Sequence, residues 1–144
     1  MDARTTDRTC RDILERYRTW AVVGCSADRW RDSHDVAAAL QRWGYRIVPV
    51  NPYAGDEVLG EHCYDRLTDV PGDARVEVVD LFRRSDHVGP HVDEAIAIGA
   101  KAVWMQLGVV DEDAAQRARD AGLQVVMDRC PKIEYPRLLR ARSG

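Results

Sequence analysis

The stretch Trp20-Ala21-Val22-Val23-Gly24-Cys25-Ser26 decides the fold of this chain. It reads as a buried strand that ends in a turn of small residues and leads into a helical pattern opening near Ser33. Such a turn makes an anion site, because free backbone N–H groups point at one spot and the helix dipole favours negative charge there. The pattern is G-x-S rather than the G-x-G-x-x-G of dinucleotide sites, so the rest of the chain must decide which nucleotide binds.

Strand and helix patterns alternate along the rest of the sequence. Gly44, Gly99 and Gly122 each end a helical stretch and are followed at once by a strand pattern, as expected for glycine at a helix C-terminus. Residues 51–75 are turn-like, with one short helix over 65–70. The expected strands cover residues 20–23, 45–50, 76–81, 102–105 and 124–127, and the expected helices cover 9–18, 33–43, 86–98, 111–121 and 133–139.

This alternation predicts an α/β fold, a Rossmann-like doubly wound parallel five-stranded sheet in the strand order 3-2-1-4-5. The 144 residues form one domain, residues 1–144, with frayed ends at about 1–8 and 140–144. Arg137, Arg140 and Arg142 are expected to fray into solvent.

Composition excludes several function classes. Hydrophobic residues make up 45% of the chain and charged residues 31%, as in an ordinary soluble protein. The net charge of -3 argues against nucleic-acid binding, and no stretch resembles a signal peptide or a membrane span. The four cysteines, Cys10, Cys25, Cys63 and Cys130, form no C-x-x-C pair. We therefore expect no metal site and a reduced, cytoplasmic location.

The segment after the first strand supplies most of the candidate ligand contacts. Gly24 would let the backbone approach a diphosphate closely, while Arg29 and Arg31 suit bidentate contacts with phosphate oxygens. Ser33 fits a helix N-cap equally well, and both arginines also fit a solvated surface. Packing is favoured for Cys25 and a helix-surface position for His34. The candidates here are Gly24, Cys25, Ser26, Arg29, Arg31, Ser33 and His34.

Asn51-Pro52-Tyr53, after the second strand, discriminates between nucleotides. A nicotinamide-dinucleotide protein usually has Asp or Glu at this point to hold the ribose diol. Asn51 is neutral and would not repel an adenosine 3′-phosphate, so it favours coenzyme A (CoA) over NAD. Pro52 offers a flat apolar edge to adenine. An ordinary turn is the alternative.

Further candidates follow the third and fourth strands. Arg83 and Arg84 lie close to the expected nucleotide cleft, where a salt bridge or a helix start are the alternatives. Gln106 has an amide that could hydrogen-bond a pantetheine arm, and Gly108 permits close approach, although a simple turn explains both. After the fifth strand, the neighbours Asp128 and Arg129 are best explained as an internal ion pair.

Together these segments resemble a known family, the small stand-alone CoA-binding proteins. Their domain is similar to the nucleotide-binding domains of the succinyl-CoA synthetase α-subunit and of ADP-forming acyl-CoA synthetases. The resemblance extends over roughly residues 9–139. It lies in residues 22–26, 44–52, 58–60, 80–84, 104–109 and 126–134.

The resemblance implies a Rossmann-like fold and CoA or an acyl-CoA as ligand, with no established reaction for the stand-alone members. It implies a phosphate loop at Gly24-Cys25-Ser26, followed by Arg31 and Ser33, and an adenosine segment at Asn51-Pro52. Relatives often have Lys just after this Pro, a natural partner for a CoA phosphate. Here Tyr53 stands there, so tight 3′-phosphate recognition requires Arg29, Arg31 or Arg83 in its place.

The favoured function is therefore non-catalytic binding of CoA or an acyl-CoA. No arrangement of nucleophile and base follows from spacing alone, so no catalytic residue is assigned. Two alternatives stay open. One is an NAD(P)-binding oxidoreductase-type domain, and the other is an acyl-CoA-sensing or redox-linked regulator that docks on a protein partner through Cys25 or Cys130. A homodimer also stays open, because neither the oligomeric state nor the acyl group follows from the sequence.

Overall fold

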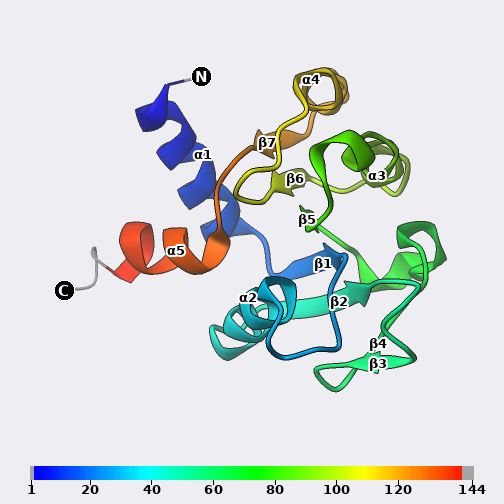
Figure 1. Cartoon of the computed structure of the whole chain (residues 1–144). Helices are drawn as coiled ribbons and strands as arrows, with labels where there is room; N and C mark the ends of the chain where they lie inside the picture. Colours follow the sequence, from blue (N-terminus) through cyan, green and yellow to red (C-terminus); the bar gives the residue numbers. More distant parts are fainter. Residues whose placement is uncertain (1, 141–144) are drawn as a thin grey trace.

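The computed structural model describes residues 2–140, which form a five-stranded parallel sheet with helices on both faces (Figure 1). The strands of this sheet are β1 (Thr19–Val23), β2 (Arg46–Val50), β5 (Val78–Leu81), β6 (Ala102–Met105) and β7 (Gln124–Val126). The helices are α1 (Ala3–Arg16), α2 (Asp32–Arg42), α3 (Val88–Ala97), α4 (Glu112–Asp120) and α5 (Pro131–Tyr135). The predicted α/β class and parallel five-stranded sheet are confirmed.

The predicted strand order is wrong. The strands lie in the order β2-β1-β5-β6-β7, so the third strand of the sheet pairs with the first, and β2 lies at the edge. In the register, Val22 of β1 lies between Pro49 of β2 and Asp80 of β5. The strand order therefore reverses between β1 and β5, the first and third strands of the sheet, whereas the predicted order places the reversal between the first and fourth strands.

Pro49 gives the physical reason for this order. A proline has no backbone N–H and is therefore confined to edge strands. The Pro49 carbonyl accepts a hydrogen bond from the Tyr64 amide at 3.0 Å, so this residue faces the outer edge of β2. The segment that follows covers that edge with a small hairpin, β3 (Glu57–Val58) and β4 (Glu61–His62).

The sheet is buried on both faces, as parallel sheets are. Trp20 and Val22 of β1 pack on the side of α1, α2 and α5, whereas Ala21 and Val23 pack on the side of α3 and α4. Figure 1 shows these two groups of helices on opposite sides of the sheet. The single strand β1 therefore joins both halves of the core.

The described residues near both ends of the chain are better held than predicted. Helix α1 begins at Ala3 and not near residue 9, and the Asp2 carboxylate caps it by accepting from the Thr5 amide at 2.8 Å. Residues 3–8 are thus helical instead of frayed. Residues 141–144, Arg142 among them, lie outside the described residues, and for Arg140 only the backbone is described.

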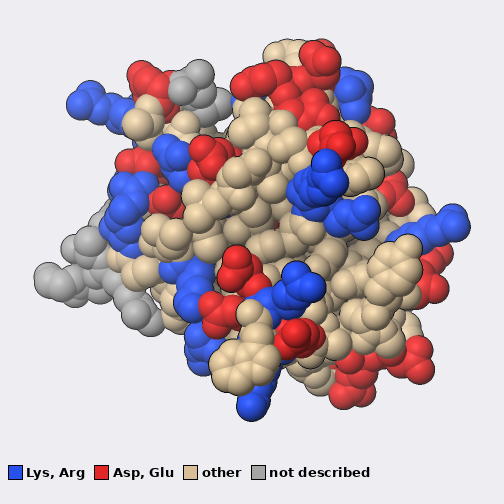
Figure 2. All heavy atoms as spheres, viewed as in Figure 1, with Lys and Arg blue, Asp and Glu red and all other residues tan. Residues whose placement is uncertain are grey.

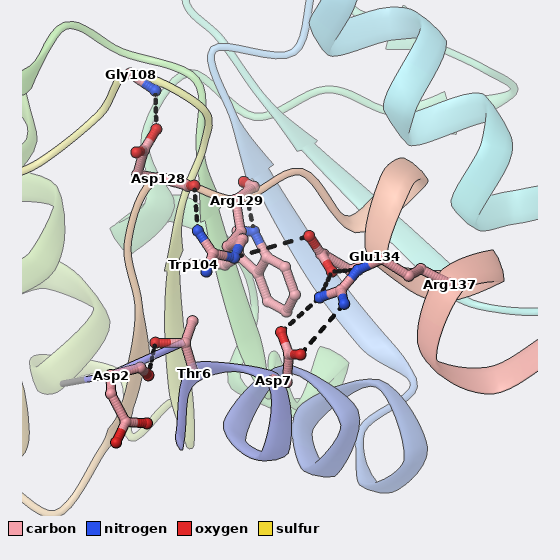
Figure 3. Close-up of polar contacts among 9 residues, drawn as sticks. All are labelled: Asp2, Thr6, Asp7, Trp104, Gly108, Asp128, Arg129, Glu134 and Arg137. Carbon is pink, nitrogen blue, oxygen red and sulfur yellow. Dashed lines mark hydrogen bonds and ion pairs between the residues drawn. The ribbon is translucent and has the colours of Figure 1, made fainter. Parts of the chain in front are cut away.

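Arg137 does not fray into solvent. Its guanidinium donates to Glu134 of α5 at 2.8 Å and to Asp7 of α1 at 3.2 Å (Figure 3). Glu134 is buried, with 5% exposure, so this contact satisfies a charge inside the protein. The cluster joins the first and last helices.

Candidate ligand site at the carboxyl edge of the sheet

The reversal of strand order places a crevice beside β1. The loops that follow β1 and β5 lead to helices on opposite faces of the sheet, and a crevice forms between them. Ligands of open α/β sheets bind in this crevice, beyond the carboxyl ends of the strands. The turn at Gly24 occupies this place. Its amide donates to the Val50 carbonyl at 2.8 Å, and the Phe82 amide donates to the Val23 carbonyl at 2.9 Å. The ends of β2, β1 and β5 are thereby held together.

The loop between β1 and α2 has a fixed shape. The Ser26 amide donates to the Ser33 hydroxyl at 2.9 Å, and the Ser26 hydroxyl accepts from the Asp28 amide at 3.0 Å. The Asp28 carboxylate in turn accepts from the Trp30 amide at 3.0 Å. Ser33 lies inside α2, and its hydroxyl holds the loop through this contact with Ser26. The expectation that Ser33 caps the helix is wrong, because Arg31 is the N-cap residue.

The N-terminus of α2 is open to an anion. Arg31 is the N-cap residue, and its side chain makes no capping hydrogen bond. The first amides of a helix have no partner within the helix, and they carry its positive dipole end. Two carboxylates, Asp32 and Asp35, lie in the same turn. Asp35 forms an ion pair with Lys132 of α5, whereas Asp32 forms no ion pair among the described residues.

Two adjoining cavities open at this edge, and Asp32 and Phe82 line both. The first, which we call the loop cavity, measures about 480 Å³ and is further lined by Gly24, Ser26, Trp30, Arg31, Ser33 and Asn51. The second, the α5 cavity, measures about 650 Å³. Its walls include Val36, Arg83, Gln106, Leu107, Cys130 and Ile133. Together they offer a polar compartment next to a mostly apolar one.

A buried polar pair lies behind the α5 cavity. With its nitrogen facing Asp80, the Gln106 amide donates to both carboxyl oxygens, at 2.7 and 3.1 Å. Asp80 is fully buried, and burial raises the pKa of its carboxyl group well above the ordinary value. Gln106 is thus engaged with Asp80 at one end of its amide.

Eight of the fourteen predicted site residues line one of the two cavities. Gly24, Ser26, Arg31, Ser33 and Asn51 line the loop cavity, and Arg83, Arg84 and Gln106 line the α5 cavity. The other six line neither of these cavities. They are Cys25, Arg29, His34, Pro52, Tyr53 and Gly108.

Asn51 is held from both ends of its amide. The side-chain nitrogen donates to the Cys25 carbonyl at 3.0 Å, and the side-chain oxygen accepts from the Tyr53 amide at 2.9 Å. The residue therefore ties the loop after β2 to the loop after β1. It contributes no carboxylate to the loop cavity, where a ribose diol would require one.

Gly108 and the segment after β7 have structural partners. The Gly108 amide donates to the Asp128 carboxylate at 2.7 Å, while Arg129 faces Glu134 at 3.8 Å (Figure 3). The expected ion pair between Asp128 and Arg129 is wrong, because each side chain points to a different element. Asp128 instead ties the loop after β6 to the end of β7.

The cysteines carry no activated thiol. All four are buried, and none forms a disulfide. Burial raises the pKa of Cys25 to about 12 and also raises the pKa of Cys130. A thiol becomes a nucleophile when its pKa is lowered, so these surroundings oppose redox or covalent chemistry at Cys25 and Cys130.

Charge near the site is local. Figure 2 shows basic and acidic side chains interspersed over the face that it draws, with no continuous basic field among the described residues there. The described residues include no group of three potential metal ligands. No helix within residues 2–140 is long and apolar enough to cross a membrane.

Sequence reasoning missed Trp30 and part of the lining of the α5 cavity. Trp30 is 82% exposed and lines the loop cavity. An aromatic residue inside the polar run Asp28-Arg29-Trp30-Arg31-Asp32 was the available sign, since such a loop has no core to fill. Cys130 was predicted only as a thiol that contacts a partner, and Ile133 gave no sign, because both residues reach the cavity through the packing of α5 against α2.

Comparison with known proteins relates this architecture to a family. The model of a family described as a CoA binding domain matches residues 18–136. The uncharacterized protein YneT of Bacillus subtilis (strain 168) is 38% identical over 125 residues, which cover 87% of this chain and 90% of that protein. A hypothetical protein from Pyrococcus horikoshii OT3 shares 41% identity, with a TM-score of 0.86 and 92% of each chain covered.

A larger enzyme contains a similar domain. The structure of a dinucleotide-forming acetyl-coenzyme A synthetase from Ca. Korarchaeum cryptofilum matches 79% of this chain, with 27% identity and a TM-score of 0.67. The match covers 26% of the synthetase, so the likeness concerns one part of that protein.

Proposed function

This chain belongs to the CoA-binding domain family, and from that premise we propose that it binds coenzyme A or an acyl-CoA at the carboxyl edge of its sheet. The proposed role is binding without a reaction of its own. The observation that carries it is the pair of adjoining cavities at the strand reversal, beside a glycine turn and an uncapped helix N-terminus.

The loop cavity suits the diphosphate. The open N-terminus of α2 faces this compartment, and Arg31 lines it. Helix N-terminal amides bind anions, and a guanidinium adds charge-assisted hydrogen bonds. The rigid loop from Ser26 to Ser33 keeps these groups in place before the ligand arrives, which lowers the entropy cost of binding.

The α5 cavity suits the pantetheine arm. It adjoins the loop cavity through Asp32 and Phe82, and its walls are mostly apolar. Arg83 and Arg84 line it from the end of β5, although Arg84 also pairs with Asp86 at 3.5 Å. An extended chain that leaves the diphosphate can lie here, with its thiol or acyl end toward Cys130 and Ile133. The likeness to part of an acetyl-coenzyme A synthetase supports CoA as the class of ligand.

The residue after β2 argues against NAD. Asn51 is neutral, and its amide is used within the protein, so the end of β2 lacks the carboxylate that holds a nicotinamide-dinucleotide ribose. This supports CoA over the NAD(P)-binding alternative. Micromolar to millimolar affinity would be enough for a binding module at ordinary cofactor concentrations.

Titration calorimetry tests the proposal. The protein is titrated separately with CoA, acetyl-CoA, NAD and NADP under identical conditions. We expect one saturable site for CoA or acetyl-CoA and a ligand-dependent rise in melting temperature, with no saturable heat from NAD or NADP. Arg31→Ala should weaken CoA binding by about 5- to 30-fold, because one charge-assisted contact is lost. Preferential binding of NAD would refute the proposal.

A further inference from the structure

The large apolar side chains that are exposed among residues 2–140 gather at the carboxyl edge of the sheet. They are Trp30, Tyr53, Leu107, Val110 and Ile133. Trp30 follows β1, Tyr53 follows β2, Leu107 and Val110 follow β6, and Ile133 lies on α5. Exposed apolar groups that line a cavity mark a binding surface, and three of these five side chains do so: Trp30, Leu107 and Ile133.

Trp30 is fixed in place although its ring is exposed. Its amide donates to the Asp28 carboxylate at 3.0 Å, and the amide of Arg31 donates to the Asp28 carbonyl at 3.0 Å. The indole is 82% exposed, yet it lines the loop cavity together with Gly24. A rigid loop that holds a bare aromatic ring at the mouth of a cavity is suited to stacking on a flat ligand group.

Arg29 lies against the same ring. Its guanidinium carbon is 5.0 Å from the centroid of the Trp30 ring, within the range of a cation–π contact. This contact occupies one side of the indole and fixes a positive charge beside it. The arrangement offers an aromatic surface and a cation a few ångströms apart.

A nucleotide with a phosphate on its ribose matches this pairing. We propose that Trp30 and Arg29 form the adenosine subsite, in which the indole stacks on the adenine ring and the Arg29 guanidinium binds the ribose 3′-phosphate. This subsite rests on the proposed binding of CoA and adds to it the residues that recognise the adenosine end.

Two other residues are less suited to these tasks. Tyr53 is 90% exposed but does not line the loop cavity, so it lacks a wall against which a base could be held. Arg83 lines the α5 cavity instead, on the side assigned to the pantetheine arm. Arg29 is the cation that contacts the Trp30 ring, and it is therefore assigned to the 3′-phosphate.

Trp30 is the most exposed of the four tryptophans, so the fluorescence of the native protein can be used to follow it. Of the four tryptophans, Trp20 and Trp104 are fully buried, and Trp43 is stacked on Tyr135 with ring centroids 4.2 Å apart. Acrylamide quenching of the native protein therefore reports mainly on Trp30. We expect CoA and dephospho-CoA to shield this tryptophan, and 4′-phosphopantetheine, which lacks adenosine, to leave the quenching unchanged.

Calorimetry with the same three ligands separates the two roles. Trp30→Ala should weaken the binding of CoA and of dephospho-CoA by about 5- to 150-fold, which is the range for losing one base–aromatic stack. The binding of 4′-phosphopantetheine should not change. Trp30→Phe should restore most of the affinity. Arg29→Ala should weaken CoA by about 5- to 30-fold but dephospho-CoA far less, and Arg29→Lys should keep part of the preference for CoA.

Matched substitutions control for general surface effects. Val110→Ala removes another exposed apolar side chain at the same edge, and Arg75→Ala removes an arginine from the loop before β5, at the opposite edge of the sheet. Neither change should alter the affinity for CoA. Circular dichroism should show all variants folded, because Trp30 and Arg29 are exposed.

The outcomes distinguish this subsite from the broader proposal. If the native chain binds CoA while Trp30→Ala and Arg29→Ala bind all three ligands unchanged, the adenosine lies elsewhere and CoA binding stands. If the native chain binds none of the three ligands, both proposals fail. If Trp30 became shielded from acrylamide without any ligand as the concentration of this protein was raised, Trp30 would lie in a contact between copies of the chain. That result would overturn the subsite.

Discussion

A Cβ atom placed on Gly24 would lie 2.4 Å from the carbonyl oxygen of Phe82, closer than real Cβ contacts come. Gly24 also has a φ of +85°, where other residues are strained. This glycine is therefore required by the packing of the β1 turn against the end of β5, before any ligand is considered. A substitution here tests the fold as much as the site.

Gly24→Ala should lower the free energy of unfolding by about 2–4 kcal/mol, because backbone strain and a collision with backbone add together. Gly60→Ala is the matched control. Gly60 has a φ of +78° and nothing within 4 Å of the position that an added methyl group would take. The substitution Gly60→Ala should therefore lower the free energy of unfolding by only about 1 kcal/mol. Urea unfolding followed by circular dichroism measures both. Equal losses would mean that the contact with Phe82 relaxes freely.

Asp32→Asn should tighten CoA binding by about two- to tenfold. The Asp32 carboxylate lines both cavities and forms no ion pair among the described residues, so it repels an incoming phosphate. Calorimetry at low ionic strength measures the effect, which should shrink in high salt because ions screen exposed charges. Weaker binding by this variant would show that Asp32 holds a ligand group instead.

Asp80 should make stability depend on pH. Its pKa is raised by burial, so the folded state holds the proton more tightly than the unfolded state does. Below the ordinary value of 3.8 this preference stabilises the fold in full, and the stabilisation is lost as pH rises toward the raised pKa. The side chain in Asp80→Asn cannot ionise, so the free energy of unfolding of this variant should rise relative to that of the native chain as the pH increases above 3.8.

Unfolding by urea at a series of pH values provides the comparison. Gln106 can still donate to the side-chain oxygen of Asn at position 80, which preserves part of the buried contact. Two profiles that run parallel over this range would contradict the assignment of the proton to Asp80.

Arg137→Ala should destabilise the protein by about 1–3 kcal/mol. The change leaves the buried carboxylate of Glu134 with Arg129 at 3.8 Å as its remaining charged partner and releases Asp7 of α1 (Figure 3). The matched control is Arg117→Ala, which removes an exposed ion pair with Asp93 at 2.9 Å and should cost less. Thermal unfolding of both variants measures the difference, and an equal loss would mean that the cluster adds nothing beyond a surface pair.

Much of the fold was predictable because its signals are local. The buried run from Trp20 to Val23 and the glycines after three helices mark where elements begin and end, and the strands of the parallel sheet lie within about two residues of the predicted ranges. Strand order depends on pairing across the chain, which local patterns do not encode. Pro49 did carry the missing information, since a strand that contains proline belongs at the edge.

The site was predictable only in part for the same reason. Gly24 and the polar loop follow from the motif, whereas Ser33 serves the loop through a contact seven residues away, and Gln106 turns toward Asp80 on the neighbouring strand. The sequence alone marks Trp30 as an aromatic residue in a polar loop and does not show what it faces. Its place at the mouth of a cavity appears only when the loop is folded.

A co-crystal structure with CoA tests the central claim most directly. In this complex we expect phosphate oxygens within about 3 Å of the backbone amides that begin α2. We also expect the pantetheine arm to lie in the α5 cavity and the adenine ring to stack on the Trp30 indole. A complex that leaves both cavities empty, with CoA bound at another surface, would contradict the central claim.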